Sequence, residues 1–192
     1  MRKLRSSLPA ILCAIFVALS AHAEIQLGSI GFLTAESVNN VDGMHEYGFL
    51  FRYRIHNHST SILMPSSLDL LAGKIERGSD AGSFISFGPS YRFDVKKSEA
   101  SRWFLDFGVH PTYAEKTTYG GRSLGGNFHF TTHIGLGAYL DRQKRTSALL
   151  RYQHTSNAGM NTPNPGLDML GLTFSYHFGE THRLLSAEIT SE

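Results

Sequence analysis

Residues 102–113 read RWFLDFGVHPTY, a stretch in which large apolar residues alternate with smaller, polar or charged ones. Successive side chains of a β-strand point to opposite faces, so residues two apart share a face. One face of this strand is large and apolar, and consists of Trp103, Leu105, Phe107 and Val109. The other face is small, polar or charged, and consists of Asp106, Gly108 and His110. The stretch is therefore predicted to be a strand with one apolar and one polar face.

The same pattern recurs along the chain, with clusters of Gly, Asn, Asp and Ser between the segments. It predicts eight strands, over about 25–34, 45–55, 66–76, 82–93, 102–113, 126–140, 146–156 and 168–178. Aromatic residues dominate the apolar faces, whereas charged residues, His and Gly dominate the opposite faces. Apolar outside and polar inside is the pattern of a transmembrane barrel, and eight strands form the smallest barrels of this kind.

We therefore predict an all-β fold, an eight-stranded antiparallel transmembrane β-barrel of the outer-membrane type over residues 24–178. Strands of about ten residues suit a tilted crossing of a bilayer. A soluble β-barrel or sandwich is the alternative, because its strands alternate as well. Inward-facing Glu46, Arg52, Arg54 and Asp106 are expected to form an ion-pair network inside the barrel.

The N-terminal segment predicts export. Three basic residues precede a short apolar run over 8–19, and a small-residue cleavage site ends at Ala23. This is the arrangement of a cleaved secretion signal over 1–23, and the run is too short to cross a bilayer as a helix. A chain cut there keeps 169 of 192 residues, enough for one domain, and loses Cys13, its one cysteine.

Charge excludes one class of partner. The signal holds three of the 18 Lys and Arg and none of the 16 Asp and Glu, which leaves 15 basic against 16 acidic residues. A balanced charge gives no electrostatic case for nucleic-acid binding. An exported barrel is expected in the bacterial outer membrane, in contact with outer-membrane lipids.

Polar residues interrupt the apolar faces near the C-terminal end, where residues 151–159 read RYQHTSNAG. An even strand number puts both termini on the periplasmic side, so the connection between 146–156 and 168–178 lies at the outer surface. Parity places His154 and Ser156 on the lipid-facing side of one strand, and Asp168 on the lipid-facing side of the next. Polar groups there are costly unless they hydrogen-bond one another or have a function.

The chemistry that these residues suit is ester hydrolysis. Ser156 would attack as nucleophile, His154 would accept its proton, and Asp168 would orient the imidazole. Asn157 and Gly159 follow directly and are candidate donors to an oxyanion. A site on the lipid-facing surface would receive its substrate from the membrane, so the substrate is expected to be a lipid.

This pattern resembles a known family. The run HTSNAG at 154–159, followed by Pro163-Asn164, Gly166 and an acid at 168, is similar to the signature of the lipid A 3-O-deacylases of the PagL type. The resemblance implies an eight-stranded outer-membrane barrel that removes the 3-hydroxyacyl chain from the 3-position of lipid A, the membrane anchor of lipopolysaccharide. It implies His154 as base, Ser156 as nucleophile, Asp168 as orienter, and Asn157, Gly159 and Asn164 as oxyanion support. No metal or cofactor is implied.

The chain departs from the family pattern at two places. The family acid is usually Glu, whereas this chain has Asp168, which is one methylene shorter, so the strand register must close the gap. Barrels of this kind commonly end on an aromatic residue such as Phe178, whereas this chain continues through 179–192, which we interpret as a periplasmic tail.

Other interpretations remain open at this point. An outer-membrane phospholipase uses a similar His-x-Ser-Asn-Gly element, but those barrels have more strands. A non-catalytic barrel would use HTSNAG as a strand end and turn. His129 and His133 are about 13 Å apart along a strand, so a buried polar network is expected there rather than a metal site. Acyl-chain preference and the existence of a homodimer are not determined by the sequence.

Overall fold

The computed structural model describes residues 24–38, 43–56, 64–95 and 102–179 as an eight-stranded antiparallel barrel with one added hairpin. The barrel strands are β1 (Glu24–Ser37), β2 (Met44–His56), β3 (Ser67–Arg77), β4 (Asp80–Asp94), β5 (Trp103–Ala114), β8 (Phe128–Tyr139), β9 (Thr146–Ser156) and β10 (Leu167–His177). The hairpin consists of β6 (Thr118–Tyr119) and β7 (Arg122–Ser123). No helix among the described residues is long and apolar enough to cross a membrane.

Each strand pairs with its neighbours in the chain, and β1 pairs with β10 to close the barrel. The eight predicted strands are confirmed, whereas the sequence pattern missed the hairpin because each of its strands has only two residues. The predicted secretion signal at 1–23 lies outside the described residues, as does the tail apart from Gly179.

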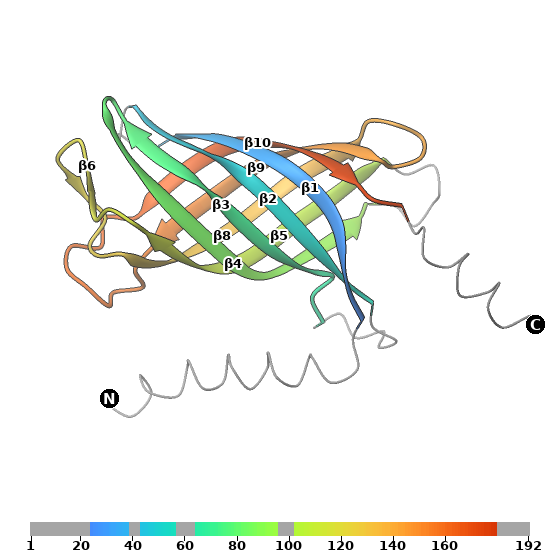
Figure 1. The fold of residues 1–192 in the computed structure, drawn as a ribbon, viewed down its shortest axis with the longest axis horizontal. Helices are drawn as coiled ribbons and strands as arrows, with labels where there is room; N and C mark the ends of the chain where they lie inside the picture. Colours follow the sequence, from blue (N-terminus) through green and yellow to red (C-terminus); the bar gives the residue numbers. More distant parts are fainter. Residues whose placement is uncertain (1–23, 39–42, 57–63, 96–101, 180–192) are drawn as a thin grey trace, which may run out of the picture.

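The two mouths of the barrel differ (Figure 1). β1 begins and β10 ends at one mouth, which we call the terminal mouth. The β6–β7 hairpin and the loop over 157–166 lie at the opposite mouth, which we call the hairpin mouth. In an outer-membrane barrel with an even strand number the terminal mouth faces the periplasm, so the hairpin mouth faces the outer leaflet.

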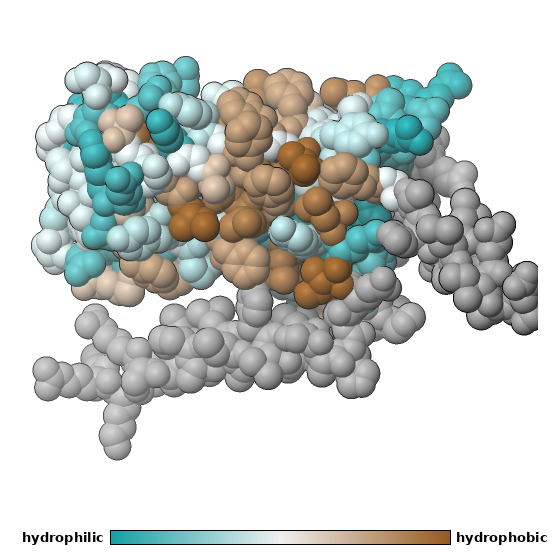
Figure 2. Space-filling view, viewed as in Figure 1, coloured by the Kyte–Doolittle hydropathy of each residue, from teal (hydrophilic) through white to brown (hydrophobic). Residues whose placement is uncertain are grey.

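The outer surface carries a belt of apolar side chains. Figure 2 shows this belt around the middle of the visible face, with hydrophilic residues towards both mouths. On β5, Trp103 is 55% exposed and Val109 is 48% exposed, whereas Asp106 and His110 are completely buried. Burial therefore follows the predicted parity, with the apolar face outside and the polar face inside.

A cluster of ion pairs fills the middle of the barrel. The Arg52 guanidinium donates to Asp69 at 2.8 and 2.6 Å and to Asp106 at 2.6 and 3.1 Å. Arg92 donates to Asp106 at 2.9 Å, and His133 Nε2 lies 3.1 Å from the same carboxylate. Buried charges are tolerated when they are paired and hydrogen-bonded in this way.

The expected internal network is therefore present, but two of its expected members, Glu46 and Arg54, lie outside this cluster. Glu46 accepts a hydrogen bond from Gln153 at 2.9 Å, and Arg54 lines the terminal mouth instead of joining the cluster. His129 and His133 contact different groups, because His129 Nε2 lies 2.8 Å from the carbonyl oxygen of Gly126.

The interior near the hairpin mouth is apolar, which the sequence pattern did not predict. The buried cluster consists of Leu33, Ala35, Met44, Leu50, Leu71, Ile75, Phe84, Tyr119, Leu124, Leu167 and Met169. Tyr119 and Leu124 come from the hairpin region, so the hairpin folds over the mouth and covers this cluster. Burying apolar side chains against one another stabilises this closure and holds the hairpin beside the β9–β10 loop.

Candidate active site

The strand register brings together two of the three residues predicted to form a triad. Asp168 of β10 is paired directly with His154 of β9. Their side chains form a hydrogen bond in which Nδ1 of His154 lies 2.8 Å from Oδ1 of Asp168. Directly paired residues have Cβ atoms about 5 Å apart, so a short aspartate reaches the imidazole without the extra methylene of a glutamate.

Ser156 is the last residue of β9 and lies on the same face as His154, as the i, i+2 spacing predicts. Both side chains are partly exposed on the outside of the barrel, whereas Gln153, Thr155 and Arg151 between and beside them are buried in its interior. The structure contains no hydrogen bond between the described side chains of Ser156 and His154. Catalytic hydrogen bonds often form only once substrate binds, so the absence of this bond does not argue against proton transfer between the two residues.

A tyrosine also contacts the acid. The Tyr152 hydroxyl donates to Asp168 Oδ1 at 2.6 Å, so this oxygen contacts both Tyr152 and the imidazole. Tyr152 precedes His154 by two residues and therefore shares its face. A tyrosine on the lipid-facing side of a barrel is usually an interface residue, so the sequence did not identify this contact.

The loop between β9 and β10 is organised by Asn157, whose side chain is completely buried. Its Nδ2 lies within hydrogen-bond distance of three carbonyl oxygens, those of Gly125 at 2.9 Å, Asn161 at 3.1 Å and Pro163 at 3.1 Å. Its Oδ1 accepts from the backbone N–H of Gly159 at 2.9 Å. These contacts tie the loop to itself and to the segment after the hairpin.

The residues predicted to support an oxyanion therefore lie together, but most of their donors are used within the loop. The backbone N–H of Asn157 donates to Asn164 Oδ1 at 3.0 Å, and the N–H of Gly159 donates to Asn157. Asn157 and Gly159 were expected to donate to an oxyanion, whereas in the structure their backbone N–H groups donate to partners within the loop. Asn164 accepts through Oδ1, and its Nδ2 group forms no hydrogen bond with a described residue.

Gly166 positions the loop against the imidazole. Its φ is +66°, a conformation that favours glycine, and a Cβ placed there would lie 3.0 Å from Cε1 of His154. The carbonyl oxygen of Gly166 accepts a hydrogen bond from Nη2 of Arg122, on strand β7 of the hairpin. Arg122 precedes Gly166 by 44 residues in the chain, and no spacing rule connects the two.

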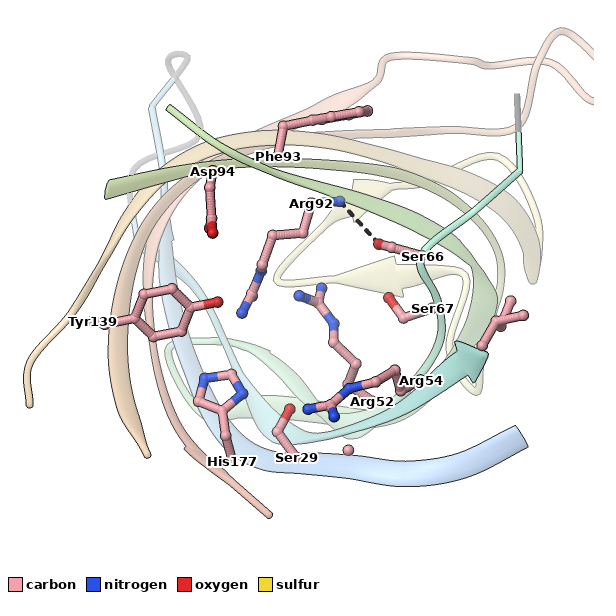
Figure 3. A pocket seen from close by; sticks show the side chains of 12 residues that line it. Ser29, Arg52, Arg54, Ser66, Ser67, Arg92, Phe93, Asp94, Tyr139 and His177 are labelled. Atoms are coloured by element: carbon pink, nitrogen blue, oxygen red, sulfur yellow. Dashed lines mark hydrogen bonds between the residues drawn. The ribbon is translucent and has the colours of Figure 1, made fainter. Parts of the chain in front are cut away.

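A separate cavity of about 530 Å³ opens at the terminal mouth (Figure 3). Figure 3 shows the side chains of Arg52, Arg54, Arg92, Tyr139 and His177 around it. Arg52 and Arg92 of the buried ion-pair cluster line this cavity, whereas Ser156 and His154 do not. The cavity is therefore not part of the candidate active site. Within the described ranges, no group of three or more His, Cys, Asp or Glu residues lies close enough to hold a metal ion.

The chain is similar to known proteins in three respects. The family model described as "Lipid A 3-O-deacylase (PagL)" matches residues 40–177. "Lipid A deacylase PagL" of Bordetella bronchiseptica (strain ATCC BAA-588 / NCTC 13252 / RB50) is 42% identical over 77 residues, which cover 40% of this chain and 42% of that relative. The matched segment thus spans less than half of the relative's length.

A solved structure supports the fold. The "Crystal structure of the outer membrane enzyme PagL" superimposes with a TM-score of 0.63 and 19% sequence identity, over 78% of this chain and 99% of that one. The family model covers well over half of the chain and includes both strands that carry the candidate site, β9 and β10. The chain therefore belongs to the lipid A 3-O-deacylase (PagL) family.

Proposed function

We propose that this protein hydrolyses the ester that links a 3-hydroxyacyl chain to the 3-position of lipid A. The observation that carries the proposal is the His154–Asp168 hydrogen bond on the outer surface of the barrel, two residues from Ser156. A base, its orienting acid and a hydroxyl on one lipid-facing surface are the groups that acyl transfer requires. Membership of the family supports lipid A as the substrate.

In the first half of the reaction, the Ser156 oxygen attacks the ester carbonyl carbon while its proton passes to Nε2 of His154. Asp168 accepts from Nδ1–H, which selects the tautomer whose Nε2 is free to accept that proton. The tetrahedral intermediate then collapses, the bond to the sugar oxygen breaks, and His154 returns its proton to the departing 3-hydroxyl group.

In the second half, a water molecule attacks the acyl-serine with His154 again as the base. The products are a free 3-hydroxy fatty acid and regenerated Ser156. The Nδ2 group of Asn164 is the side-chain donor that we assign to the developing oxyanion, because its Oδ1 is held by Asn157. Substrate would reach this site from the outer leaflet, where the apolar belt ends near the hairpin mouth.

The test is mass spectrometry of lipid A from bacteria that express the wild-type chain or Ser156→Ala. Loss of one 3-hydroxyacyl group with the wild-type chain alone would support both the reaction and the nucleophile. Unchanged lipid A from a folded wild-type barrel would contradict the proposal. Lysophospholipid in the same extracts would then indicate a phospholipase.

A further inference from the structure

Two arginines lie on either side of the β6–β7 turn, next to the candidate active site. Arg77 is the last residue of β3, and its Nη1 donates to the carbonyl oxygen of Gly120 in the turn at 2.8 Å. Arg122 is paired with Tyr119 across the hairpin, and its Nη2 donates to the carbonyl oxygen of Gly166. The hairpin therefore brings together one guanidinium from the barrel wall and one that contacts the β9–β10 loop.

Neither guanidinium forms an ion pair with a carboxylate of the described residues. The nearby Asp80 is occupied, because it pairs with Lys116 and accepts from the backbone N–H of Gly120 at 3.1 Å. Nε of Arg122 is buried and has no hydrogen-bond partner among the described groups. Partial burial and, to a lesser extent, the positive charge of Arg77 lower the pKa of Arg122, whereas the carboxylate of Asp168 raises it.

Arg122 is linked to His154 through one intervening residue, Gly166. It contacts Gly166, and Gly166 lies directly against the His154 ring. A group bound by Arg122 would thus lie at the rim, beside the base and above the apolar belt. This is the level at which the headgroup of an outer-leaflet lipid lies when its acyl chains contact the strands.

Guanidinium groups with unused N–H donors suit phosphate. Their planar fork matches two phosphate oxygens, and their positive charge compensates the negative charge of the phosphate. Lipid A carries phosphate groups on the glucosamine disaccharide whose hydroxyls bear its ester-linked chains. We propose that Arg122 and Arg77 bind a phosphate group of lipid A and thereby position the ester over Ser156. This inference rests on the proposed function and adds to it a determinant of substrate recognition.

The experiment compares four full-length, folded proteins: wild type, Arg122→Gln, Arg77→Gln and the control Arg142→Gln, whose residue is exposed in the β8–β9 turn at the terminal mouth. Each is assayed in detergent micelles for release of 3-hydroxy fatty acid from three forms of lipid A. One form carries both phosphates, one lacks the 1-phosphate, and one lacks the 4′-phosphate. Heat-dependent electrophoretic mobility verifies that each barrel is folded.

With the diphosphorylated substrate, we expect Arg122→Gln to lower kcat/KM about tenfold, mainly through KM, and Arg77→Gln to lower it less. The lost contact between Arg122 and Gly166 should lower activity equally on all three forms, so the phosphate contribution is the additional loss that disappears on the form that lacks the contacted phosphate. Arg77→Gln should match the wild type on that form, and Arg142→Gln should match it on all three. A defect of Arg122→Gln that is equal on all three forms would overturn the phosphate site and assign Arg122 to the loop alone. No release by the wild type from any form would instead overturn the proposed function.

Discussion

His154 and Asp168 face each other directly across the β9–β10 pair, with Nδ1 of the imidazole 2.8 Å from Oδ1 of the carboxylate. The contact lies on the outside of the barrel, whereas Glu46, Arg52, Asp69, Asp106 and Arg151 are buried in its interior. A charge-assisted hydrogen bond on this surface orients the imidazole. The Thr132 hydroxyl donates to the backbone carbonyl of His154 at 3.5 Å, and the loop approaches the ring so closely that a Cβ at Gly166 would lie 3.0 Å from Cε1.

Asp168→Asn tests this relationship. The amide is nearly isosteric, but it can donate to Nδ1 and so favour the wrong tautomer of His154, and we expect kcat to fall about 10³- to 10⁴-fold. Asp168→Glu keeps the charge, although its longer side chain must bend between directly paired strands, so we expect a smaller loss. Steady-state kinetics on lipid A in micelles provides both values. Equal activity of Asp168→Asn and wild type would exclude Asp168 from the proposed triad.

Tyr152→Phe tests the second contact of the acid. It removes the hydroxyl that donates to Asp168 at 2.6 Å and leaves the aromatic ring on the lipid-facing surface. Because a hydrogen bond to a charged group contributes about 1.5–3 kcal/mol, we expect kcat to fall about tenfold or more, with KM nearly unchanged. Tyr176→Phe is the matched control, because Tyr176 is also exposed on the outside of β10. A similar loss in both variants would show that the Tyr152 contact has no specific role.

Alanine variants of two glycines in the β9–β10 loop distinguish the effect of backbone strain from the effect of a clash with the imidazole. Gly166 and Gly159 both have positive φ, +66° and +74°. A Cβ at Gly166 would lie 3.0 Å from His154 Cε1, whereas a Cβ at Gly159 would have no atom within 4 Å. Both alanine variants should lose about 1 kcal/mol of stability from the left-handed backbone, but only Gly166→Ala should also displace the base and lower kcat. Kinetics and denaturant unfolding of the two variants distinguish these effects, and equal kcat values would contradict the assigned contact.

Asp106→Asn tests the interior rather than the site. Asp106 is completely buried and accepts from Arg52, Arg92 and His133. Removing its charge leaves the buried guanidinium of Arg52 and the partly buried guanidinium of Arg92 with too little compensation, and we expect a loss of about 3–5 kcal/mol in the free energy of unfolding. Urea unfolding of the protein in lipid vesicles measures this loss. Below the unfolding transition the activity should stay near that of the wild type, because the candidate site lies on the opposite face of the wall.

Several features of the site could be predicted because they depend on parity alone. Alternation with a period of two is a local property of the chain, so it assigned His154, Ser156 and Asp168 to the outer face before any partner was known. The same rule predicted that Arg52 and Asp106 lie inside, and the structure confirms this. It did not predict the apolar interior at the hairpin mouth, because that cluster depends on a hairpin too short to show alternation.

Residue alternation was sufficient to predict an eight-stranded barrel, its inner and outer faces, and the rim on which His154, Ser156 and Asp168 lie. It could not predict that Asp168 is directly opposite His154, that Tyr152 donates to the same carboxylate, or that Asn157 uses its donors to hold the loop. Nor could it predict that Arg122 reaches Gly166 across 44 residues. The physical reason is that side-chain direction follows from the local backbone period, whereas register and loop contacts depend on the closure of the whole barrel and the packing of the hairpin over its mouth.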